Sequence, residues 1–238
     1  MKRLLSLSAL ILSLCNGGAQ ATLVYSNNFD GPAYTAPGVS ASGPSGGFTG
    51  SVTGGPYTGS NGKSWSGSYF GSGDSSTLTL SNLPGHTQLS IDMMLGFLNS
   101  WDSRNGTVTP DNLEVWIDGT LVLDMTTDNA SGSVVDFDGG TLVVDNGQID
   151  GSTFYSDDLV DMATAPALTL AHSASTLTLQ IAPSGSGWQG WPDEGWGIDD
   201  LRIHVTGGGG ASVPEPAGPA LFGLGLVGMG LARRRARV

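Results

Sequence analysis

The stretch LSIDMMLGF at residues 89–97 decides the fold class of this chain. Its apolar residues recur at every second position, at Leu89, Ile91, Met93, Leu95 and Phe97. A period of two places these side chains on one face of an extended strand, since successive residues of a strand point to opposite faces. Nine such residues span about 30 Å, enough to cross a sheet from end to end. The stretch therefore predicts a long strand with one face in a core.

Shorter segments with the same alternation follow on both sides of this strand. Leu113, Val115 and Ile117 face one way, with Glu114, Trp116 and Asp118 opposite, and the Asp118-Gly119 pair is a hairpin-turn signal. The other apolar sets are Leu23, Tyr25 and Phe29; Leu78 and Leu80; Leu121 and Leu123; residues 142–144, 168–170 and 177–181; and Leu201, Ile203 and Val205. Eight or more short antiparallel strands in about 185 residues predict an all-β fold, a two-sheet jelly-roll sandwich. Residues 33–62 are rich in Gly, Ser and Pro and are expected to form long loops.

The charge distribution excludes nucleic acid as a partner. Without the two ends of the chain, 20 acidic residues (21 less Glu215) face only Lys63, Arg104 and Arg202, a formal charge of −17. Such a body repels phosphates and anionic membranes and suits divalent cations or simple solubility. The single cysteine, Cys15, lies near the N-terminus, so the domain that follows has no disulfide and no cysteine ligand.

The N-terminal 21 residues have the three parts of a signal peptide. Lys2 and Arg3 precede an apolar run at residues 4–14, and Ala19-Gln20-Ala21 forms an A-x-A cleavage site before Thr22. We expect export by Sec-type machinery and cleavage by signal peptidase after Ala21. The alternative is a buried N-terminal helix.

The C-terminal end has a second ordered set of signals. Residues 207–212 form a Gly-rich linker, Pro214-Glu215-Pro216 follows, and an apolar run covers residues 217–232. As a helix this run is about 24 Å long, a short transmembrane segment. The cluster Arg233-Arg234-Arg235 should stay cytoplasmic and leave the preceding domain outside.

The order of Pro-Glu-Pro, short apolar span and Arg cluster at residues 213–238 resembles the PEP-CTERM sorting signal. The resemblance implies recognition by an exosortase, cleavage near the motif, and an association with envelopes that carry exopolysaccharide. It implies a protein held briefly in the inner membrane and then released to the outer surface or extracellular matrix. A plain C-terminal anchor without processing is the alternative.

Residues 22–206 resemble the jelly-roll ectodomains of concanavalin-A-like type that such proteins carry. The similarity is carried by residues 83–87 (LPGHT), 100–102 (SWD) and 194–200 (EGWGIDD). It implies a fold rather than an activity, because such domains share no single function.

Two carboxylates are candidate calcium ligands. Asp199 has the parity of Leu201, Ile203 and Val205, so it is expected on the inward face, where a charge needs compensation. Asp30 ends the first strand, and the first and last strands of a jelly roll are often neighbours. Hard oxygen ligands at such an edge suit Ca²⁺, and backbone N–H donors are the alternative. Asp102 and Glu194 are weaker candidates.

Aromatic and acidic residues gather in the loop before the last strand. Trp188, Trp191 and Trp196 occur with Asp193 and Glu194 within nine residues, as in sites that stack on a sugar and bind its hydroxyl groups. A polysaccharide hydrolase that uses Asp193 or Glu194 is one interpretation, and tryptophans that pack the loop against the sandwich are the other.

The histidines show no zinc-site spacing. His86 is expected in a turn, bonded to loop backbone, and His204 on the outward face of the last strand. Together the sequence favours a non-enzymatic structural or glycan-binding surface protein, with the hydrolase as the alternative.

Overall fold

The computed structural model describes residues 20–106, 109–130, 132–153 and 155–207. The leader up to Ala19 and the linker and sorting signal from residue 208 onward, with Pro214, Glu215, Pro216 and the three arginines, lie outside the described residues. The signal-peptide and transmembrane-helix predictions therefore stay predictions.

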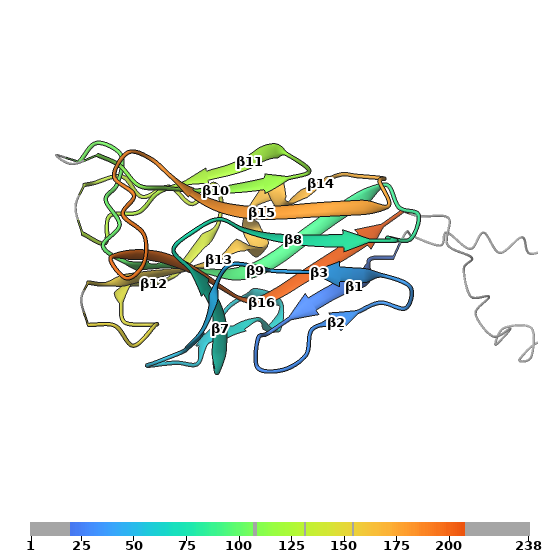
Figure 1. Ribbon diagram of the computed structural model, residues 1–238, viewed down its shortest axis with the longest axis horizontal. Coiled ribbons are helices and arrows are strands. Elements are labelled where there is room, and N and C mark those ends of the chain that lie inside the picture. The colour runs from blue at the N-terminus through green and yellow to red at the C-terminus, as the bar shows by residue number, and fades with distance from the viewer. Residues whose placement is uncertain (1–19, 107–108, 131, 154, 208–238) are drawn as a thin grey trace, which may run out of the picture.

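The described chain is built from antiparallel strands in two large sheets and a small hairpin (Figure 1). Sheet A has nine strands: β12 (Thr141–Gly147), β13 (Asp157–Asp161), β9 (Gln88–Asn99), β16 (Glu194–Thr206), β1 (Thr22–Asn27) and β2 (Tyr34–Thr35) in that order, with β14 (Thr169–Ala171) beside β9, β7 (Ser68–Ser72) beside β16, and β4 (Phe48–Ser51) beside β7. Sheet B has the order β11 (Thr120–Met125), β10 (Asn112–Ile117), β15 (Thr176–Ser184), β8 (Ser76–Ser81) and β3 (Ser40–Ser42). The hairpin pairs β5 (Tyr57–Thr58) with β6 (Ser64–Trp65).

Helical structure in the described ranges is limited to three 3-10 turns: η1 (Ser60–Gly62), η2 (Met162–Thr164) and η3 (Pro166–Leu168). None of the helices in these ranges has the length and apolar character needed to span a membrane.

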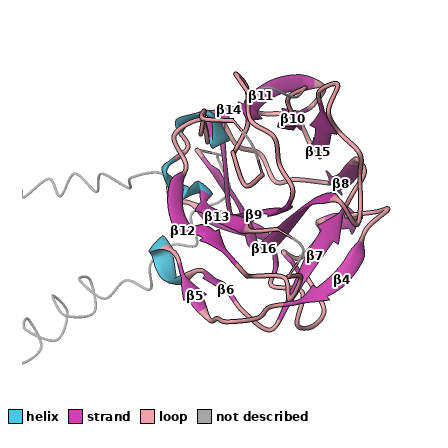
Figure 2. Cartoon of the chain, turned by 90° about the vertical axis from the view of Figure 1, so that its left-hand side faces the viewer, coloured by secondary structure: helices cyan, strands magenta, loops and turns pink. Residues whose placement is uncertain are grey.

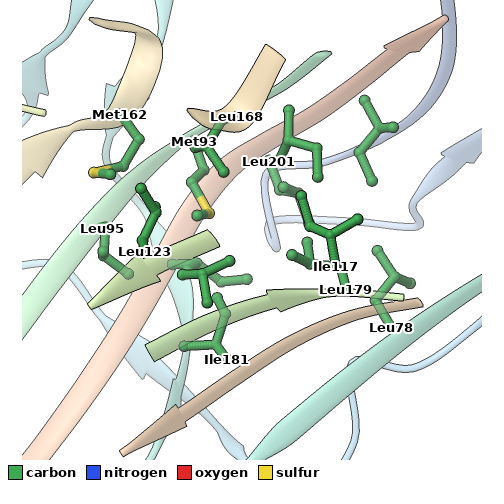
Figure 3. Close-up of a cluster of buried hydrophobic side chains, with 14 of the residues drawn as sticks. Leu78, Met93, Leu95, Ile117, Leu123, Met162, Leu168, Leu179, Ile181 and Leu201 are labelled. Carbon is green, nitrogen blue, oxygen red and sulfur yellow. The ribbon is translucent and has the colours of Figure 1, made fainter. Parts of the chain in front are cut away.

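The two large sheets face each other across one apolar core, so the sandwich prediction is confirmed. Met93 and Leu95 of β9 and Leu201 of β16 meet Leu179 and Ile181 of β15 (Figure 3). All five alternating residues of the 89–97 stretch are at most 2% exposed and belong to this core. The end-on view in Figure 2 shows sheet B lying over β9 and β16 at the centre of sheet A.

The turn residues in the sequence correctly predict one hairpin, but the long loops predicted for another region are only partly found. Asp118 and Gly119 have φ values of 49° and 75°, as the tight β10–β11 turn needs, and this prediction is confirmed. Residues 33–62 are not simply loops, because β2, β3, β4, β5 and η1 form there. These strands are two to four residues long, too short to show a period in the sequence.

A bulge in β16 changes which face its side chains occupy. Asp199 pairs with Met94 of β9 while Arg202 pairs with Asp92, so β16 has one residue more than its partner. Asp200 has φ 49° within this bulge. Because one extra residue inverts the alternation, Trp196 and Ile198 before the bulge face the same core as Leu201 after it.

Three glycines in neighbouring strands form a flat floor on the other face of sheet A. Gly197 of β16 lies opposite Gly96 of β9 on one side and Gly71 of β7 on the other. The rings of Trp65 and Tyr69 stack above this floor with centroids 4.7 Å apart. They belong to a second apolar cluster with Met94, Leu98, Ile149 and Leu159. The missing side chains thus make room for the aromatic pair.

Gly197→Ala should destabilise the protein. A Cβ at this position would lie 2.8 Å from Tyr69 Cδ2 and 2.9 Å from Trp65 Cη2, so the stacked rings would have to move. Overpacking of this kind costs about 1–3 kcal/mol in free energy of unfolding. Gly31→Ala is the matched control, since a Cβ there meets no atom within 4 Å. Equal urea midpoints for the two variants would contradict this role of Gly197.

Candidate functional site

A groove of about 720 Å³ lies on the outer face of sheet A, opposite the main core. Outward side chains of β9, β16 and β1 form its floor. The segment around β2 forms one side, and residues of the η2–β14 segment form the other. The polar residues that line it are Ser26, Asn27, Asn28, Tyr34, Asn61, Ser90, Asp92, Thr169, Asp200, Arg202 and His204. This is a concave surface rich in hydrogen-bonding groups.

A buried lysine beside the groove fixes part of its floor. Lys63 is fully buried, and its Nζ lies 2.7 Å from Asp92 Oδ1 and 2.9 Å from Asp161 Oδ1. Burial alone would raise the pKa of Asp161, but the Lys63 ammonium and the bonds from Ser60 lower it to about 2. This network holds η1 against sheet A, and the single Lys63 charge is shared between Asp161 and the Asp92 carboxylate at the groove.

Arg202 and His204 present a cation and a neutral ring at the same surface. Arg202 bonds to both oxygens of Asp200 and donates from Nη1 to the Asn61 carbonyl at 2.8 Å. Burial lowers the pKa of His204, so its imidazole is neutral at neutral pH and can both donate and accept. The outward orientation predicted for His204 is confirmed. Tyr34, 47% exposed, adds an aromatic surface to the groove.

The structure brings Asp30 and Asp199 to one turn. β1 pairs with β16, as expected for the first and last strands. Ser68 N donates to Asp30 Oδ1 at 2.7 Å, and Ser66 N donates to Asp199 Oδ2 at 2.9 Å. Gly67 between them has φ 64°, and a Cβ there would lie 2.3 Å from Asp30 Oδ1. The turn can therefore approach both carboxylates closely only with glycine at its centre.

The parity argument for Asp199 was wrong, although the side chain is buried. The bulge places Asp199 on the face of sheet A opposite Leu201, Ile203 and Val205. Both of its oxygens accept backbone N–H groups, from Ser66 and Asp200. Burial nevertheless raises its pKa to about 7, and the charges of Asp200 and Asp30 add to this. Calcium binding at Asp199 stays a prediction. The backbone N–H groups of Ser66 and Asp200 are donors of the kind that the alternative to calcium requires.

The predicted sugar-contacting cluster is not one surface. Trp196 is fully buried, packs near Phe70 and donates from Nε1 to the Asp74 carbonyl. Trp188 is half-buried against Trp101, and Trp191 is 43% exposed beside Phe48. The packing alternative thus fits Trp196 and Trp188.

No three His, Cys, Asp or Glu side chains among the described residues gather in a way that could hold a metal ion.

The acidic members of that cluster bond to protein groups. Glu194 is fully buried and accepts from Gln189 N, while Asp193 accepts from the Ser100 hydroxyl. Asp111, which the sequence did not single out, is fully buried within hydrogen-bonding reach of Glu194. Burial raises the pKa of both carboxyl groups. The charge of Glu194 adds to the effect of burial on Asp111. Neither residue lines the groove.

Comparisons with known proteins identify the C-terminal signal. Residues 212–236 match the model of the PEP-CTERM protein-sorting motif, which confirms that resemblance. The match indicates export to the cell surface with an exosortase as processing partner. No curated protein matches the chain.

Two solved structures show distant similarity. The Agl-KA catalytic domain is 13% identical over 84% of this chain, with a TM-score of 0.32. The chain covers only 30% of that chain's length. The Stig cyclase Fisc from Fischerella sp. TAU is 12% identical over 77% of this chain and 98% of its own, with a TM-score of 0.28.

Stability should fall with rising pH through ionisation of Asp199. Its pKa is about 7 in the folded state against about 3.9 when unfolded, so the loss occurs between these values and is complete above pH 7. We expect melting temperatures several degrees lower at pH 8 than near pH 5 in chelator. Asp199→Asn should reduce this difference without removing it, since Asp111 and Glu194 titrate in the same direction.

Melting temperatures measured with added calcium distinguish a calcium site at Asp199 from stabilisation by backbone donors alone. If Ca²⁺ binds, an excess of about a hundred times its dissociation constant adds roughly 2.7 kcal/mol to the wild type at pH 8 and little to Asp199→Asn. Equal melting temperatures of the wild type with calcium and with chelator would exclude the calcium site. A pH dependence that Asp199→Asn leaves unchanged would contradict the raised pKa.

Proposed function

We propose that this chain is a non-enzymatic cell-surface protein whose sandwich binds an uncharged polysaccharide in the outer groove of sheet A. The sorting motif supports delivery to the surface, and the groove supports the binding. The finer assignment of the sandwich to the concanavalin-A-like jelly rolls belongs to the same proposal.

The shape and chemistry of the groove carry the proposal. A volume of about 720 Å³ lies within the range of small-molecule sites and can take a short run of sugar rings. Asp92 and Asn61 offer planar groups for hydrogen bonds with hydroxyl groups, and Tyr34 offers a ring for stacking. These features replace the tryptophan cluster as the expected glycan contact.

The charge of the body favours an uncharged chain. The formal charge of −17 over the exported part repels uronic acids and sulfated or phosphorylated polymers. Arg202 in the groove is already paired with Asp200, and the buried Lys63 beside the groove is paired with Asp92 and Asp161. Little positive charge is left to hold an anionic ligand there.

The hydrolase alternative finds less support in the groove. Glycosidases need two carboxyl groups across the bond to be cleaved, one of them with a raised pKa. The groove carboxylates Asp92 and Asp200 are both in ion pairs. The carboxyl groups with raised pKa, such as Glu194 and Asp199, are buried outside the groove.

Tyr34→Ala should weaken binding of an uncharged polysaccharide by about tenfold, because it removes the stacking surface. Trp191→Ala is the matched control, since it removes an exposed ring of the sequence-predicted cluster, which the groove does not include. Affinity electrophoresis of the full-length exported protein in gels with neutral or uronic acid polymers measures both. A larger loss of binding in Trp191→Ala than in Tyr34→Ala would overturn the groove assignment. Shortened polymer chains after incubation would favour the hydrolase.

Changing Pro214, Glu215 and Pro216 to alanine should block processing of the tail. The matched sorting motif contains these residues, so the variant should stay in the inner-membrane fraction with its C-terminal arginines. Intact mass measurement of wild type and variant from each fraction tests this. A variant released with the same mass as the wild type would show that the motif is not needed.

A further inference from the structure

Two histidines far apart in sequence meet at one end of the sandwich. His86, in the loop between β8 and β9, and His172, in the loop between β14 and β15, have ring centroids 4.9 Å apart and ring planes only 15° apart. His86 is 5% exposed, and the His172 side chain is 6% exposed. The bond from His86 to loop backbone was expected from the sequence and is confirmed, whereas the contact with His172 was not foreseen.

The pair lies within a chain of three hydrogen bonds. His86 Nδ1 is 2.6 Å from the Pro84 carbonyl oxygen, and His86 Nε2 is 2.6 Å from His172 Nδ1. His172 Nε2 is 3.0 Å from Asp118 Oδ2 in the β10–β11 turn, and Asp118 Oδ1 accepts from Thr178 N at 2.8 Å. Every ring nitrogen of the pair therefore faces one definite partner.

Counting hydrogens shows that two neutral rings cannot make all three bonds. The Pro84 carbonyl only accepts, so His86 Nδ1 must carry a hydrogen. One further hydrogen is needed between the rings, and a third between His172 and the Asp118 carboxylate. Two neutral imidazoles supply only two. A third proton, shared by the rings and balanced by Asp118, completes the chain.

We propose that His86 and His172 form one proton-binding site that clamps three loops together at the end of the sandwich where the chain leaves β16. When the third proton dissociates, one of the three contacts is left with two acceptors facing each other. That contact must lengthen, which loosens the link between the β10–β11 turn and the two loops that join sheet A to sheet B. The site thus makes this end of the domain sensitive to external pH.

The surroundings leave Asp118 as the charged group that acts on the pair. The segments around the site are residues 82–87, 117–120, 171–176 and 205–207, and their only other titratable side chains are the two histidines themselves. Thr87 N donates to the Thr206 carbonyl, and His172 N donates to the Thr87 carbonyl. The clamp is therefore joined by backbone bonds to the last residues of β16, directly before the linker.

A proton fits this site better than a metal ion. Two nitrogens bound to one tetrahedral zinc ion at 2.0–2.1 Å lie about 3.3 Å apart, farther than the 2.6 Å between these rings. Asp118 contacts the remote nitrogen of His172, so it is no third ligand at the same centre.

Nitrogen-15 NMR of the imidazole groups in the full-length exported protein tests the proton count. At about pH 5.5, we expect three protonated nitrogens among the four of His86 and His172, with His204 as internal reference. At about pH 8.5, we expect two, together with protection factors for amide exchange at His172 and Thr178 that are lower by about tenfold. Four protonated nitrogens at the lower pH, or rings that titrate independently, would overturn the proposal.

Asp118→Asn removes the need for the third proton. The Asn amide can donate to His172 Nε2 and can still accept from Thr178, so two neutral rings satisfy every contact. We expect the count at the lower pH to fall from three to two in this variant. Asp138→Asn is the matched control, because Asp138 also has φ 49° and accepts a backbone N–H but shows no contact with either histidine. An unchanged count in Asp118→Asn, or displacement of the proton by equimolar Zn²⁺, would refute the shared-proton site.

Discussion

The pairing of β9 with β16 is the constraint on which the rest of this structure depends. These two strands lie side by side over nearly their whole length, and every other strand of sheet A attaches directly or indirectly to one of them. The bulge at Asp199–Asp200 lets one face of the pair supply the main core along its entire length. On the other face, the part before the bulge lies under the second cluster around Trp65, while the part after it forms the floor of the groove. One inserted residue thus divides the outer face into an apolar region and a polar one.

Much of the fold could be read from local patterns. The alternation at residues 89–97 and at 113–117, and the Asp118-Gly119 turn, are determined by side chains close in sequence, and the structure contains them. The face of Asp199 could not be read in this way, because alternation is a reliable guide only while a strand stays regular. No sequence pattern between Glu194 and Leu201 predicts a bulge. The positive φ of Asp200 is stabilised by its contacts with Ser64 and Arg202, which are distant in sequence or on the far side of the bulge.

The candidate site was less predictable than the fold, for a physical reason. The groove combines residues such as Ser26, Tyr34, Asn61, Asp92 and Arg202, which only the pairing of distant strands brings together. The tryptophan cluster was visible in the sequence because its members are neighbours in the chain. The cluster extends across the start of β16, however: Trp196 lies in the strand and fills the main core, while Trp191 lies in the preceding turn and stays outside. Proximity in sequence therefore indicated a packed loop more than a binding surface.

The position of the chain ends has a mechanical consequence. β1 begins and β16 ends at the same end of the sandwich, with Thr22 opposite Val205 (Figure 1). A pull on the C-terminal tail acts along β16, which lies between β9 and β1, so it loads many hydrogen bonds of both ladders in shear instead of opening them one by one. A polymer held in the groove would pull on Arg202 and His204, only a few residues from that exit. Tension between a surface tether and a bound polymer would then run through a few residues of a central strand and bypass most of the domain.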